Sequence, residues 1–217
     1  MTVKNLTKLY LDSLNQDYPG REIRSALVIL FREYMNWNRG EIHLNPDFII
    51  PQNIRDKFLE TLRQLKLGIP LQYILNKAWF GNFTLYVDER VLIPRPETEE
   101  LCKLIISQIR QMKIIPTAIL DIGTGSGCIA LDLKRAFPDA IVTAMDHSLS
   151  SLNIAGLNSR MCNAELALLR DDILNPESVN DPRQYDVIVS NPPYVTESEK
   201  KVMHRNVIEH EPPSALS

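Results

Sequence analysis

Apolar residues in the first third of the chain recur every three or four positions, which is the period of an α-helix. Three stretches show this spacing, at residues 3–14, 23–34 and 54–65. Residues that interrupt helices, such as Pro19-Gly20, lie between them. The pattern predicts a helical bundle over residues 1–75, with the apolar stripes as its core. We expect Asn38-Arg39-Gly40 and residues 68–74 to form turns.

The pattern changes at Trp79, where aromatic and β-branched residues come close to alternating with other residues. Gly81-Asn82 and Asp88-Glu89 are turn signals within this stretch, so we expect a β-hairpin in a linker over residues 76–95. Pro96 suits the first turn of the helix that follows.

From residue 118 onward, short apolar runs alternate with amphipathic stretches. Strands are expected at 118–122, 141–145, 166–170 and 185–189, and helices at 128–136 and 149–161. This alternation is typical of an α/β domain with a parallel sheet and helices on both faces. We assign it to residues 96–217.

The composition of the chain argues against a nucleic-acid-binding, membrane-spanning or secreted protein. A net charge of −3 gives the chain no general affinity for nucleic-acid phosphates or anionic lipid. No run approaches the ~20 apolar residues of a membrane span, and the N-terminus lacks the apolar core of a signal peptide. The cysteines Cys102, Cys128 and Cys162 form no CxxC pair and suit a reducing compartment as packing residues. We expect a cytoplasmic protein.

A glycine-rich segment, Asp121-Ile122-Gly123-Thr124-Gly125-Ser126-Gly127, follows the first strand of the α/β region. Glycines allow a ligand to approach the backbone closely, and the start of a helix offers free N–H groups. A dinucleotide fingerprint needs a third glycine at the position of Cys128, so a pyrophosphate cofactor is disfavoured. Asp121, in the last turn of the strand, can receive a cationic amino group.

Acidic residues follow the next two strands. Asp146 can accept hydrogen bonds from ribose hydroxyls, and Asp172 can meet an adenine amino group with Ile173 against the ring. Each acid alone could equally be a helix cap or a turn residue. Three acids at successive strand ends suit a nucleoside with positive charge, and S-adenosylmethionine is such a cofactor.

The fourth strand ends in Ser190-Asn191-Pro192-Pro193-Tyr194, because two prolines cannot continue a central strand. The side-chain carbonyl of Asn191 and the backbone carbonyl of Pro192 can accept both hydrogens of a planar NH₂ group. Tyr194 offers a ring for stacking. The nitrogen lone pair would then face a methyl donor, and this chemistry requires no metal. The histidines share no ligand spacing: His43, His147, His204 and His210.

These motifs resemble those of class I methyltransferases with an NPPY motif, and among them the HemK/PrmC protein-glutamine methyltransferases. More specific than NPPY are residues 68–74 (GIPLQYI), Phe80-Gly81 with Phe83, and residues 91–99 (VLIPRPETE). The resemblance implies a Rossmann-like, mainly parallel sheet and an N-terminal bundle that recognises the substrate. It also implies methylation of the glutamine in the Gly-Gly-Gln loop of peptide chain release factors.

By this resemblance, two groups of residues form the active site. The cofactor or its reacting end is held by Gly123, Thr124, Gly125, Ser126, Gly127, Asp146, Asp172, Ile173 and Asn191. The substrate glutamine is held by Asn191, Pro192, Pro193 and Tyr194, of which Asn191, Pro192 and Tyr194 are the expected catalytic residues.

Two other functions remain open at this point. Adenine methyltransferases of DNA or RNA present the same planar NH₂ to an NPPY motif, although a pI of 5.8 suits a protein substrate better. The second open function is that of a non-catalytic module that binds a cofactor or a partner. The family pattern continues past Leu216, whereas this chain stops at Ser217. We therefore expect a sheet without its last strands and cofactor binding that survives better than catalysis. Separately, we expect a monomer.

Overall fold

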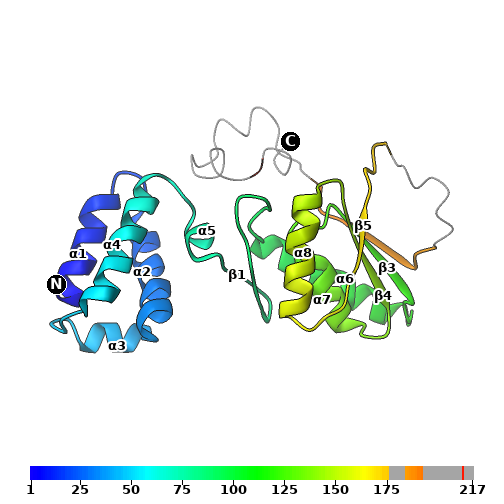
Figure 1. Cartoon of the computed structure of the whole chain (residues 1–217). Helices are drawn as coiled ribbons and strands as arrows, with labels where there is room; N and C mark the ends of the chain where they lie inside the picture. The colour runs from blue at the N-terminus through cyan, green and yellow to red at the C-terminus, as the bar shows by residue number, and fades with distance from the viewer. Residues whose placement is uncertain (176–183, 193–211, 213–217) are drawn as a thin grey trace. The chain divides into compact units, whose positions relative to one another are not determined.

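The computed structural model describes residues 1–175, 184–192 and 212. The chain divides into two compact units, Met1–Ile74 and Leu75–Ser217 (Figure 1). No helix in the described part of the chain is long and apolar enough to cross a membrane.

The first unit is a bundle of α1 (Val3–Leu14), α2 (Gly20–Met35), α3 (Arg39–Leu44) and α4 (Gln52–Lys66). Its core holds the apolar stripes predicted from the sequence, including Tyr10, Phe31 and Phe58, whose exposed fractions are all 0%. The Tyr10 hydroxyl donates to the carbonyl oxygen of Phe58 at 2.6 Å. This bond satisfies a polar group that would otherwise be costly to bury.

Two segments expected to be turns contain short helices. Asn38 caps α3, because its side chain accepts hydrogen bonds from the N–H groups of Gly40 and Glu41 while the Glu41 carboxylate accepts from the N–H of Asn38 at 2.6 Å. This reciprocal capping box stabilises a helix in a polar stretch that lacks an apolar stripe. The second is α5 (Leu71–Leu75), which begins directly after Pro70.

The predicted hairpin is present but shorter than expected. It consists of β1 (Ala78–Phe80) and β2 (Phe83–Leu85), paired antiparallel with Ala78 opposite Leu85. Beyond β2, the Tyr86 backbone bonds to a side chain instead of a strand: its N–H donates to Asn158 Oδ1 at 2.7 Å. The Asn158 amide donates in turn to the Tyr86 carbonyl at 3.0 Å. A side chain therefore replaces the partner strand, and the ladder ends.

The second unit contains a four-stranded parallel sheet in the order β5-β4-β3-β6. Its strands are β3 (Ala118–Ile122), β4 (Ile141–Asp146), β5 (Ala167–Arg170) and β6 (Val187–Ser190). The helices are α6 (Pro96–Gln111), α7 (Cys128–Ala136) and α8 (Leu149–Met161). For the four strands, α7 and α8, these bounds lie within two residues of those predicted. Among the described strands, β6 lies at one edge and pairs with β3.

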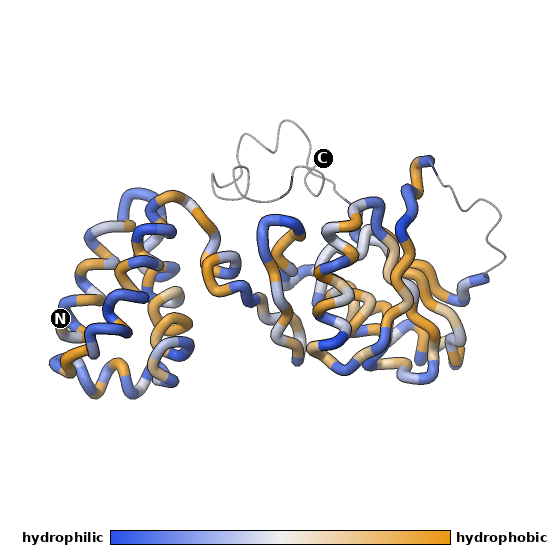
Figure 2. The backbone as a smooth tube through the Cα atoms, in the orientation of Figure 1, coloured by the Kyte–Doolittle hydropathy of each residue, from blue (hydrophilic) through white to orange (hydrophobic). Residues whose placement is uncertain are grey.

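The described helices lie on one face of this sheet, not on both as expected. The crossovers β3-α7-β4 and β4-α8-β5 run in the same direction along the sheet, and right-handed crossovers place both helices on the same side. α6 packs against α7, and Figure 1 shows the three helices together beside the strands. Figure 2 shows that the strands are strongly apolar.

The core of the second unit lies between this sheet and its helices. It includes Ile119 and Val142 from the strands and Leu131 from α7. Cys102 and Cys128 are free thiols in the same core, and burial raises the pKa of each well above its ordinary value. They are packing residues, as expected from the sequence.

Candidate functional site

The candidate site lies at the carboxyl edge of the parallel sheet. Because the strands are parallel, the segments that follow them emerge at the same edge, where α/β sheets bind ligands. The register places Ile122 beside Ser190 and Asp146 beside Arg170. The glycine-rich segment after β3 is therefore flanked by Asp146 on one side and by Asn191 on the other.

The glycine turn, residues 123–127, depends on three residues with positive φ. The φ angles are 71° at Gly123, 53° at Gly125 and 82° at Gly127, a region that side chains other than glycine rarely adopt. A Cβ atom at Gly123 or Gly125 would meet no atom within 4 Å, so the backbone faces open space there. A Cβ at Gly127 would lie 3.2 Å from Ala155 Cβ in α8. The first two glycines thus leave room for a ligand, and the third allows the residue before α7 to approach Ala155 of α8.

Asp121 lies beneath the glycine turn and is fully buried, with an exposed fraction of 0%. Its Oδ2 accepts hydrogen bonds from the Thr124 hydroxyl at 2.7 Å and from the Ala130 N–H at 3.2 Å. Its Oδ1 is buried with no hydrogen-bond partner. Burial raises the pKa of Asp121 to about 7, and the Asp146 carboxylate adds to the increase, although the two hydrogen bonds oppose it.

Because of this pKa, the stability of the cofactor-free protein should depend on pH. An unfolded Asp has a pKa of about 3.9. Between that value and 7, the folded chain keeps a proton that the unfolded chain releases, so the free energy of unfolding should fall as pH rises and level off above about 7. Asp121→Asn should flatten this slope and raise stability at pH 8, as measured by urea denaturation from pH 5 to 8. Parallel profiles for the two proteins would contradict the buried, protonated carboxyl.

Asp146, at the end of β4, has an exposed fraction of 6%. Its Oδ2 accepts from the Gly125 N–H at 3.0 Å, and its Oδ1 accepts from the Ser148 N–H at 2.9 Å. The Nδ1 atom of His147 lies 3.5 Å from the same Oδ1. Each carboxylate oxygen has a second lone pair, so Asp146 can brace the glycine turn and still accept hydrogen bonds from a diol.

The acids after β5 differ in their surroundings. Asp171, which no sequence motif distinguishes from Asp172, is buried with an exposed fraction of 7%, and its N–H donates to the Asp146 carbonyl at 3.3 Å. Asp172 is half-buried, and its Oδ1 accepts from the Leu174 N–H at 2.9 Å, as a turn residue does. Ile173 is 57% exposed, so its side chain is open to contact. Because the two acids are adjacent at the end of a strand, the sequence alone does not show which of them is buried.

Asn191 follows β6 and is half-buried. The hydroxyl of Ser190 donates to the Ile122 carbonyl at 3.0 Å, which ties the end of β6 to β3. The Asn191 Nδ2 donates to the Thr98 hydroxyl at 3.3 Å. Thr98 lies in the first turn of α6, and no periodicity in the sequence connects it to Asn191. Pro192 is exposed. Two predicted site residues, Pro193 and Tyr194, lie outside the described residues, as do the histidines His204 and His210.

The residues present fit an S-adenosyl nucleoside. The open backbone at Gly123 and Gly125 admits a ligand, and the acceptors of Asp146 adjoin it. No group of three or more His, Cys, Asp and Glu side chains that could hold a metal ion occurs among the residues that the structure describes.

Comparison with known proteins identifies the family of the chain. The family model described as "Methyltransferase small domain" matches residues 99–214, and "PrmC N-terminal domain" matches residues 7–75. The chain is 40% identical over 218 residues to a protein named release factor glutamine methyltransferase from Flavobacterium psychrophilum, with 100% of this chain and 75% of the relative covered.

A relative with the same name from Bacteroides thetaiotaomicron is 36% identical over 214 residues, covering 99% of this chain and 75% of the relative. A third, from Koribacter versatilis, is 34% identical over 217 residues, covering 100% and 75%. These matches span both units and confirm the fold class expected for the second. The chain belongs to the release factor glutamine methyltransferase family.

Proposed function

We propose that this protein transfers a methyl group from S-adenosylmethionine to the side-chain amide nitrogen of the glutamine in the Gly-Gly-Gln motif of release factors. The observation that carries the proposal is the position of Asn191 beside the glycine turn, in a chain of this family. An amide acceptor next to an open nucleoside site suits transfer to a planar NH₂ group.

The cofactor would lie against the glycine turn. Gly123 and Gly125 allow it to approach the backbone. Thr124 and Ser126 alternate with the three glycines and complete the turn. Asp146 would accept hydrogen bonds from the ribose, and Asp172 with Ile173 would contact the adenine. Asp121 supports the turn through Thr124 and would add negative charge below a cationic ligand once it has released its proton. When bound, S-adenosylmethionine supplies an electrophilic methyl group on a sulfonium.

The amide clamp, which we define as Asn191 Oδ1 and the carbonyl oxygen of Pro192, would hold the substrate nitrogen. Each oxygen accepts one of its two N–H groups, which directs the remaining lone pair toward the methyl group. Pro193 and Tyr194 would complete the wall, with the Tyr194 ring stacked on the amide plane. Orientation of this kind can recover roughly 7–11 kcal/mol of a reaction barrier. The clamp needs no general base, because the methylated, cationic nitrogen releases its proton to water.

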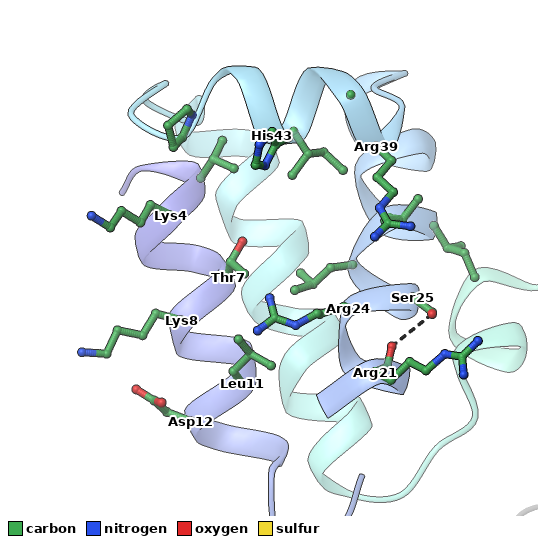
Figure 3. Close-up of a pocket in the computed structure, with 17 residues that line it drawn as sticks. Lys4, Thr7, Lys8, Leu11, Asp12, Arg21, Arg24, Ser25, Arg39 and His43 are labelled. Carbon is green, nitrogen blue, oxygen red and sulfur yellow. Dashed lines mark hydrogen bonds between the residues drawn. The ribbon is translucent and has the colours of Figure 1, made fainter. Parts of the chain in front are cut away.

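We also propose that the bundle, residues 1–75, recognises the release factor. A groove of about 1390 Å³ lies among α1, α2 and α3 (Figure 3). Its floor includes the buried side chains Val3 and Leu27. Its lining includes five exposed Lys and Arg residues, Lys4, Lys8, Arg21, Arg24 and Arg39, against one acid, Asp12.

The charge of this groove favours an acidic protein surface. None of its five cationic side chains has an ion-pair partner within the described part of the chain. Figure 3 shows Arg24 directed between α1 and α2, with Lys4 and Lys8 extending from the outer side of α1. Residues 1–74 carry ten Lys and Arg and eight Asp and Glu, a net charge of +2, whereas the whole chain carries −3.

Charge reversal in the groove should weaken recognition of the substrate without altering chemistry. Arg24→Glu is expected to raise the KM for intact release factor about tenfold, because rim charges steer association, while kcat is unchanged. The kcat/KM for a short Gly-Gly-Gln peptide should not change. Arg32→Glu is the matched control, since Arg32 is exposed on the same helix but outside the groove. Equal effects of the two substitutions on KM would refute a role for the groove.

The remaining assignments follow from the substrate. Release factors act during translation, so we place the enzyme in the cytoplasm, with a protein partner and no membrane or nucleic-acid substrate. We propose that it acts as a monomer, which sedimentation analysis would test.

A methylation assay with tritiated S-adenosylmethionine tests the proposed function. Wild-type protein should label a release factor and should not label a variant whose Gly-Gly-Gln glutamine is alanine. DNA and RNA offered in parallel should stay unlabelled. Label in nucleic acid with none in the release factor would identify an adenine methyltransferase. Cofactor binding without transfer to any substrate would indicate a binding module.

A further inference from the structure

Thr98 connects the start of α6 to the site across 93 positions of sequence. It is buried, with an exposed fraction of 7%. Its N–H donates to the Arg95 carbonyl at 3.1 Å, which fixes it in the first helical turn after Pro96. Its hydroxyl oxygen accepts from Asn191 Nδ2 at 3.3 Å. A rigid helix turn therefore contacts the side chain proposed to hold the substrate.

The contact holds one end of the Asn191 carboxamide, its donor nitrogen. An asparagine amide carries an acceptor oxygen and a donor nitrogen, and a half turn about its last torsion exchanges them. Only the oxygen can accept a hydrogen bond from the substrate N–H. In the exchanged orientation, the Asn191 NH₂ group would face the substrate N–H, and no hydrogen bond could form. The Thr98 hydroxyl can accept from Nδ2 or donate to Oδ1. In the structure it accepts from Nδ2, which leaves Oδ1 at the opposite end of the carboxamide for the substrate.

The backbone of Asn191 is held separately from its side chain. Ser190 pairs with Ile122 in the β6–β3 register, and its hydroxyl bonds to the Ile122 carbonyl. This anchors the main chain at the position where the strand ends, but it leaves the Asn191 amide free to rotate. The bond to Thr98 restricts this rotation.

We infer that Thr98 is a positioning residue, which orients the Asn191 carboxamide so that Oδ1 faces the substrate amide. The inference rests on the proposed function. It assigns a role to the threonine of the segment 91–99 (VLIPRPETE), which precedes the sheet and contributes no cofactor ligand in the scheme above. One neutral hydrogen bond typically changes an equilibrium about fivefold, which sets the size of the expected effect.

Thr98→Val, which keeps the shape but removes the acceptor, should lower kcat about fivefold and leave the dissociation constant for S-adenosylmethionine unchanged. Thr98→Ser restores the hydroxyl and should restore kcat. In an Asn191→Ala background, Thr98→Val should have no further effect, because the residue acts through Asn191. A purely structural role would instead give additive losses. If wild type transfers methyl groups and Thr98→Val retains its full kcat, the inference is wrong.

A second measurement does not depend on activity. The side-chain NH₂ signals of Asn191 can be assigned in nitrogen-15 NMR spectra by their loss in Asn191→Ala. They should shift in Thr98→Val and return in Thr98→Ser. Unmoved signals in Thr98→Val would overturn the inference even if the wild type were inactive, whereas an inactive wild type with shifted signals would refute the proposed function alone.

Discussion

Asn191→Ala is expected to lower kcat for methylation of a release factor by about 100-fold to 1000-fold, the range found when one preorganised polar group is removed from an active site. The substitution deletes one acceptor of the amide clamp, so the substrate nitrogen loses its fixed orientation. It should leave the glycine turn intact, because Asp146 and Asp121 brace that turn independently. The dissociation constant for S-adenosylmethionine should therefore change by less than about threefold.

Asn191→Asp provides the matched control. A carboxylate keeps the acceptor, and the Thr98 hydroxyl can donate to it in place of receiving a bond. This variant should retain more activity than Asn191→Ala. Steady-state kinetics and calorimetric titration with the cofactor separate the two effects. An alanine variant within tenfold of the wild-type kcat would show that the clamp does not carry the chemistry.

Asp146→Ala is expected to weaken S-adenosylmethionine binding by at least about 100-fold. A hydrogen bond to a charged group contributes about 1.5–3 kcal/mol, and the substitution removes the proposed bonds to both ribose hydroxyls. It also removes the carboxylate that accepts from the Gly125 N–H at 3.0 Å, so the glycine turn loses one of its supports. Asp146→Asn keeps one oxygen in place and should lose about tenfold. Calorimetric titration measures both values.

Asp186→Asn is the control for this prediction, because Asp186 has similar contacts at the opposite end of the sheet. Its Oδ2 accepts from the N–H groups of Thr117 at 2.7 Å and Ala118 at 3.1 Å. Changing it should affect the stability of β6 and leave cofactor affinity unchanged. If Asp146→Asn and Asp186→Asn weaken binding equally, Asp146 acts through the fold and not through the ribose.

Much of the second unit was predictable because its signals are local. Apolar runs of four to six residues define β3 and β4, and the helix periods of α7 and α8 are long enough to give bounds that match those observed. The hairpin was harder, since the side chain of Asn158 takes the place of a strand at Tyr86. The polar helix α3 was missed because its capping box contributes no apolar period.

By itself, the sequence determined the change from helical periods to a parallel α/β pattern, and the glycines and acids at the strand ends, since each depends on residues close together in the chain. Only the tertiary structure decided the placement of the described helices on one face and the contact of Thr98 with Asn191. It also decided that Asp171, and not Asp172, is buried and that the pKa of Asp121 is raised. The physical reason is that crossover handedness, desolvation and hydrogen bonding between distant segments depend on what surrounds a residue in space, which local patterns do not encode.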